Sequence, residues 1–78
     1  MREKKPTLII TFHTTTQAMA MERFCMDHHL PGRLIPVPRE ITASCGLAWK
    51  AAPEEQEVLL RQMESAQLDW DQVYTIRM

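Results

Sequence analysis

The pattern of hydrophobic and polar positions divides the chain into six short segments, separated by turn residues. Residues 7–13 are rich in β-branched and aromatic side chains, which predicts a strand, and their lack of strict alternation is typical of a central one. Thr14, three residues before Gln17, resembles a capping box and predicts a helix start. The helix should run to residue 28, with a buried face formed by Ala18, Met21, Phe24 or Cys25, and His28.

After a turn at Pro31 and Gly32, the pattern predicts two strands joined by a loop. Residues 33–38 predict a strand, and Pro36 places it at a sheet edge because proline donates no ladder hydrogen bond. Residues 39–44 are expected to form a loop. Residues 45–51 predict a third strand, with one face formed by Cys45, Leu47, Trp49 and Ala51.

A second helix is expected to begin at Pro53, because proline suits the first helical position and two glutamates follow it. Its predicted buried stripe consists of Val58, Leu59, Met63 and Ala66. Residues 72–78 predict the last strand. We expect residues 1–78 to form one domain and residues 1–5 to be a frayed leader.

The resulting order, β-α-β-β-α-β, predicts an α+β fold of the ferredoxin-like kind, a four-stranded antiparallel sheet with two helices on one face. Right-handed crossovers give the strand order 4-1-3-2. The start of the third strand should then lie beside the end of the first. This topology brings Cys45 toward His13, Thr14 and Thr15.

The composition changes this picture little. The chain has 78 residues, 45% of them hydrophobic, with a formal net charge of −1, so it offers no electrostatic case for nucleic acid. Its first twenty residues hold no apolar run long enough for a membrane segment, and two cysteines suit a cytoplasmic protein with reduced thiols. We expect no cofactor.

Cys25, His28 and His29 share one helical turn, but a metal site would need further ligands, and a solvated helix end is the alternative.

Cys45 is the candidate reactive residue, because Gly46 beside it leaves room for a substrate to approach. The start of the first helix and Arg39 would both favour its thiolate. The alternatives are structural: Cys45 as a packed residue, His13 as a turn residue, and Arg39 paired with Glu40. Cys25 is expected in the core and too far from Cys45 for a disulfide.

Residues 33–48, RLIPVPREITASCGLA, strongly resemble a small bacterial family of selenium/sulfur carrier protein-like sequences. The shared features are a threonine-containing turn at residues 13–16, the PVPREI loop at residues 36–41, and the pair Cys45 and Gly46. The resemblance implies that Cys45 holds sulfur or selenium as a persulfide-type adduct. It also implies a donor or acceptor protein such as a cysteine desulfurase. The chain lacks the Cys-Pro-x-Pro motif of other sulfur-relay carriers.

Three functions therefore stand open at the level of sequence. The first is a sulfur or selenium carrier acting through Cys45. The second is a protein-interaction or ligand-sensing domain whose binding surface is the loop of residues 36–45. An enzyme is third, because one thiol has no second acid or base paired with it. The open sheet face and the last strand, which contains no proline, also predict a homodimer.

Overall fold

The computed structural model describes residues 4–41 and 45–78. Its elements follow the predicted order, and their bounds are β1 (Pro6–Thr11), α1 (Thr15–Asp27), β2 (Arg33–Pro36), β3 (Leu47–Ala51), a 3-10 turn η1 (Pro53–Glu55), α2 (Gln56–Ser65) and β4 (Val73–Arg77). The expected loop residues 42–44 and leader residues 1–3 lie outside the described part of the chain.

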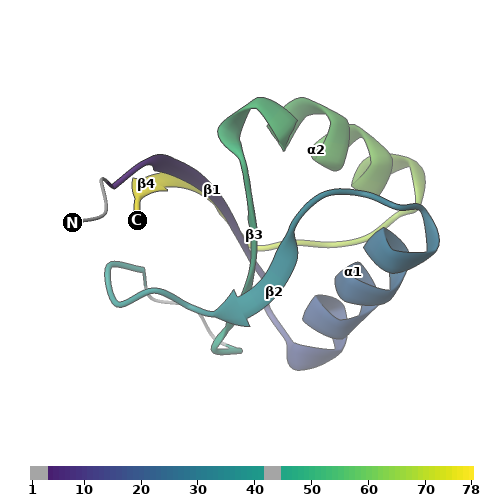
Figure 1. Ribbon diagram of the computed structural model, residues 1–78. Coiled ribbons are helices and arrows are strands. Elements are labelled where there is room, and N and C mark those ends of the chain that lie inside the picture. The colour runs from purple at the N-terminus through teal and green to yellow at the C-terminus, as the bar shows by residue number, and fades with distance from the viewer. Residues whose placement is uncertain (1–3, 42–44) are drawn as a thin grey trace.

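The four strands form one antiparallel sheet in the order β2-β3-β1-β4, which is the predicted order read from the opposite edge. Both helices lie on the same side of this sheet (Figure 1). Pro36 is the last residue of the edge strand β2. Since no strand pairs with the outer side of β2 among the described residues, a proline there loses no ladder hydrogen bond. The ferredoxin-like α+β fold is therefore confirmed.

The main core lies between the sheet and the helices. The sheet contributes alternate residues of β1 and β3, among them Leu8, Ile10 and Trp49, and α1 contributes Ala18, Met21 and Cys25. Cys45 and Leu47 pack against the same cluster, so the predicted face of the third strand is confirmed. His28 was wrongly placed on the buried face of the first helix. It is the exposed C-cap, one residue beyond the last helical turn.

The buried stripe of α2 is narrower than predicted. Leu59 and Met63 are fully buried, whereas Val58 is 43% exposed and Ala66 is an exposed C-cap. The 3-10 turn takes up the first three expected helical residues, so α2 has only ten. Leu59 and Met63 lie four positions apart on one helix face, and Val58, one position earlier, is rotated away from that face. Ala66 lies beyond Ser65, the last helical residue, so the predicted stripe was wrong at two positions.

The other sheet face is covered in part by the chain itself. Ile9 and Ala48 are fully buried there, and Ile41, only 7% exposed, packs against them from the segment that follows β2. Figure 1 shows this segment on the side of the sheet away from the helices. The backbone bond from the Val37 N–H to the Gly46 carbonyl, 3.0 Å long, closes the connection between β2 and β3 at its base.

The first and third strands are shorter than predicted at the ends next to the predicted site residues. The β3 strand begins at Leu47, so Cys45 lies in the bend that precedes it, and β1 ends at Thr11, so His13 belongs to the turn before α1. At the opposite end, Lys5 exchanges two backbone hydrogen bonds with Met78. Lys5 is thus hydrogen-bonded to the end of the chain beside β4.

Candidate functional site

The turn between β1 and α1 is organised by a helix cap. Thr14 is the N-cap residue, with extended backbone, and its Oγ accepts the Gln17 N–H at 3.1 Å. In return Gln17 Oε1 accepts the His13 N–H at 3.0 Å. The predicted pairing of Thr14 and Gln17 is confirmed, although the glutamine reaches the residue before the cap. Thr15 begins the helix and is exposed.

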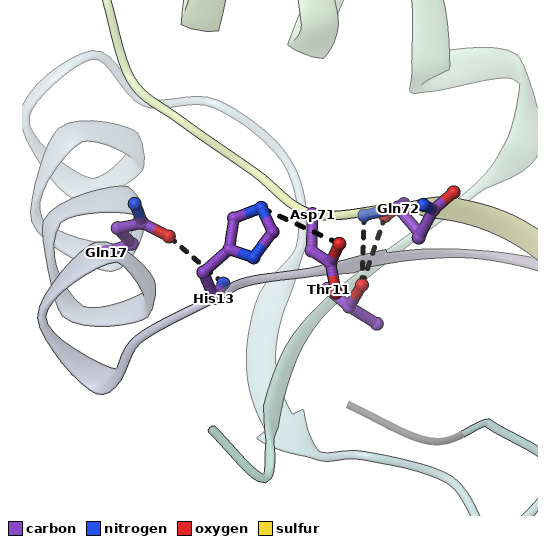
Figure 2. A network of polar contacts seen from close by, with 5 residues as sticks. All are labelled: Thr11, His13, Gln17, Asp71 and Gln72. Atoms are coloured by element: carbon purple, nitrogen blue, oxygen red, sulfur yellow. Dashed lines mark hydrogen bonds and ion pairs between the residues drawn. The ribbon is translucent and has the colours of Figure 1, made fainter. Parts of the chain in front are cut away.

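His13 faces an acidic partner from the far end of the chain. Its Nε2 lies 3.6 Å from Asp71 Oδ1, and the two side chains are 57% and 22% exposed (Figure 2). The contact becomes an ion pair when the imidazole is protonated. Asp71 was not anticipated as a partner. The available signal was its position just before the last strand, which the topology places beside the end of the first.

Buried hydrogen bonds hold the start of β4 against β1 behind this pair. The Thr11 side chain is fully buried, accepts the Gln72 N–H at 3.1 Å, and donates to the Gln72 carbonyl at 3.4 Å (Figure 2). The Asp71 N–H donates to the Thr11 carbonyl at 2.7 Å. These bonds fix the backbone from which Asp71 reaches His13.

Cys45 is half-buried and free of any disulfide. Its sulfur accepts the Leu47 N–H at 3.4 Å and lies 3.3 Å from the Leu47 carbonyl, to which a protonated thiol donates. Gly46 between them has a φ of 77°, in the left-handed region that favours glycine, and a side chain added there would meet no neighbour. Open space therefore adjoins the Cα of Gly46, the residue that follows Cys45.

The sheet register brings the predicted site residues to one end of the molecule. Thr11 pairs with Ala48, so the chain leaving β1 toward His13 runs beside the chain that enters β3 from Cys45. Within residues 4–41 and 45–78, no hydrogen bond or ion pair joins Cys45 to His13, Thr14, Thr15 or Arg39. The site is an arrangement of neighbouring segments at one sheet end.

Arg39 lies in an exposed turn close to the anchored end of the loop. The turn is held by a 3.0 Å bond from the Ile41 N–H to the Pro38 carbonyl, and Ile41 is buried against the sheet. No ion pair between Arg39 and Glu40 is present among the described residues. The arginine is therefore presented to solvent.

Cys25 differs from Cys45 in its surroundings. It is 2% exposed, its thiol donates to the Met21 sulfur at 3.8 Å, and burial raises its pKa from 9.0 to about 11. A thiol that is both enclosed and harder to ionise is a poor nucleophile. Its predicted place in the core is confirmed.

Nowhere in the described residues do three histidine, cysteine or acidic side chains gather closely enough to hold a metal ion. None of the helices there combines the length and the apolar character needed to cross a membrane.

Sequence comparison adds one match. No curated protein and no solved structure matches the chain. Residues 7–75 match the family described as "Putative Se/S carrier protein-like". This segment includes β1, the turn with His13 and Thr14, the loop with Arg39, and the Cys45–Gly46 pair. Because the match spans nearly all of the 78 residues, the chain belongs to the Se/S carrier protein-like family.

Proposed function

We propose that this protein is a carrier that holds sulfane sulfur or selenium on Cys45. The observation that carries the proposal is the contrast between the two thiols. Cys25 is enclosed in the core and has a raised pKa, whereas Cys45 is half-buried beside an open glycine and accepts a backbone N–H. Membership of the Se/S carrier protein-like family supports the same chemistry.

The loading step is a displacement without net oxidation. The Cys45 thiolate attacks the outer sulfur of a persulfide on a donor enzyme such as a cysteine desulfurase. A new S–S bond forms on Cys45, the donor's S–S bond breaks, and the donor cysteine leaves as a thiolate. An acceptor thiolate takes the outer sulfur in the same way, and selenium would follow the same route.

Neighbouring groups suit this exchange in different ways. The Leu47 N–H donates to the sulfur and stabilises negative charge on it, and the Leu47 carbonyl accepts a hydrogen bond from the resting thiol. Gly46, which follows Cys45, has no side chain, and open space adjoins its Cα. We assign anion recognition on the donor or adduct to Arg39, His13, Thr14 and Thr15, which are all exposed.

Mass spectrometry tests this proposal. The intact protein is incubated with a cysteine desulfurase and cysteine, and we expect a sulfur-sized mass addition that peptide mapping assigns to Cys45. A thiol reductant should remove the addition, since a persulfide is reducible.

The matched variants are Cys45→Ser and Cys25→Ser. Loss of the added mass in the first and its retention in the second is the expected result. An unmodified wild-type protein, under conditions that load an established carrier, would contradict the proposal.

A second candidate function is a protein-interaction or ligand-sensing domain whose binding surface is the loop of residues 36–45, with no chemical role for the Cys45 thiol. Ile41 anchors the loop on the sheet while Arg39 and Glu40 stay exposed, which is a suitable arrangement for a binding surface. Under this reading Arg39→Ala abolishes capture of a partner protein, and Cys45→Ser does not.

We place the carrier in the cytoplasm, where thiols remain reduced, and expect it to form a homodimer. The outer edge of β4 is the proposed contact, since within the described chain β4 pairs with β1 alone.

A further inference from the structure

A second concave site lies at the end of the sheet away from Cys45. It is a cavity of about 750 Å³ between the starts of β1 and β2 and the end of β3. Three basic residues line it, Lys5, Arg33 and Lys50, together with small or apolar residues such as Pro6, Ala51 and Ala52. We call it the cationic pocket.

The charges of this pocket converge because of the sheet register. Arg33 and Lys50 are direct partners across β2 and β3, and Lys50 is also the partner of Ile9 on β1. Directly opposite residues in an antiparallel pair point to the same face. Both cations therefore project on the face of Ile9, which is the face without helices.

Acidic side chains do not balance these charges, although the backbone of Met78, the last residue of the sequence, also reaches the cavity. None of the described side chains that line the cavity is acidic, and no carboxylate of the described residues forms an ion pair with Lys5, Arg33 or Lys50. Glu54 lies beyond it, in a smaller adjoining hollow that Lys5 also lines. Like charges directly opposite one another destabilise a sheet, so the arrangement has a cost that a bound anion would offset.

We propose that the cationic pocket binds a small amphipathic oxyanion, a carboxylate or phosphate carried on a short apolar body. The guanidinium of Arg33 and the ammonium of Lys50 hold the oxygens. The apolar body lies against the remaining lining of the cavity, where Pro6 and Ala52 are found. The cavity volume falls within the range of small-molecule sites, about 300 to 1,000 Å³, which favours a small ligand over a macromolecular surface.

Nuclear magnetic resonance titration of the whole chain tests this assignment with four probes. Hexanoate and hexyl phosphate carry both features, inorganic phosphate carries the charge alone, and hexylamine carries the apolar body with the opposite charge. We expect the first two to give saturable shifts of the amides of Thr7, Arg33 and Ala51. Inorganic phosphate should bind more weakly, and hexylamine should not bind.

Variants separate this pocket from general attraction of anions to the surface. Arg33→Gln and Lys50→Gln should each weaken hexyl phosphate binding about fivefold, the worth of one solvent-exposed ion pair. Arg23→Gln removes the same charge from the exposed side of α1 and should leave binding unchanged. Lys50→Gln also relieves the opposed charges, so it should raise the melting temperature while it weakens binding.

Cys45→Ser should bind hexyl phosphate as the wild type does, so this inference and the carrier proposal can fail independently. Equal weakening by Arg23→Gln, shifts spread over the whole surface, or equally tight binding of hexylamine would each overturn the cationic pocket. So would the absence of any saturable shift at Thr7, Arg33 and Ala51.

Discussion

The two cysteines show how the same side chain acquires different chemistry from its position. Cys25 lies on the helix face that packs on the sheet, and its thiol donates to the Met21 sulfur. Cys45 precedes the strand, where the Leu47 N–H and carbonyl remain within reach of its sulfur. Desolvation raises the pKa of Cys25 to about 11 because the thiolate loses its hydration.

Alkylation across pH tests this difference. At pH 8 iodoacetamide should label Cys45 within minutes and leave Cys25 unlabelled, since Cys25 is enclosed and protonated. Because the pKa of Cys25 is raised, labelling of the folded protein at Cys25 should increase only toward pH 11.

Peptide mass mapping gives the site of each label, and denaturant is the control that makes both thiols equally reactive. Faster labelling of Cys25 than of Cys45 in the folded protein would show that Cys45 is the wrong thiol.

At the scale of elements, the start of α1 is defined by a few reciprocal bonds. Thr14 satisfies one of the orphan N–H groups of the helix, and Gln17 returns to satisfy His13. The helix has no acidic residue in its first turn, so no carboxylate there stabilises the positive end of the helix dipole. Thr14 is thus a structural residue as well as a candidate binding residue.

We expect Thr14→Ala to lower the free energy of unfolding by about 1 kcal/mol, the usual worth of an N-cap. Thr14→Ser is the matched control, since it keeps the hydroxyl and should restore most of that loss. Denaturant unfolding followed by circular dichroism measures both. A Thr14→Ala protein as stable as the wild type would mean that the cap bond contributes nothing.

At the scale of the whole molecule, the sheet face without helices and the outer edge of β4 differ in how far the described chain covers them. Ile9 and Ala48 are already buried under Ile41, so the centre of the open face needs no second subunit to exclude water. The outer edge of β4 is not covered in this way by the described chain. Lys5 and Met78 exchange both backbone hydrogen bonds, and bonded and non-bonded pairs alternate along an antiparallel ladder. Thr75, three residues before Met78, is therefore in a non-bonded pair with Leu8, and its N–H points away from β1.

This geometry predicts a homodimer that forms through the outer edge of β4, and a single proline in that edge should disrupt it. Light scattering at high micromolar concentration should give twice the mass of the chain for the wild type. Thr75→Pro should give the monomer mass, because proline removes an outward N–H while the bonds to β1 remain. Thr75→Ala is the control and should stay dimeric. A monomeric wild-type protein would contradict the assembly.

The sequence alone determined the features that depend on local pattern. Periodicity and turn residues predicted the order of the elements, and Pro36 predicted which strand lies at an edge. The cap at Thr14 and the core position of Cys25 followed from spacing within one helix. Such signals are readable because the interacting groups lie within a few residues of one another.

Only the tertiary structure decided which distant residues meet. The pairing of His13 with Asp71, the opposition of Arg33 and Lys50, and the burial of Ile41 over the open face all depend on strand register and chain path. A shift of one residue in register moves a side chain to the other sheet face, and no local pattern records that choice.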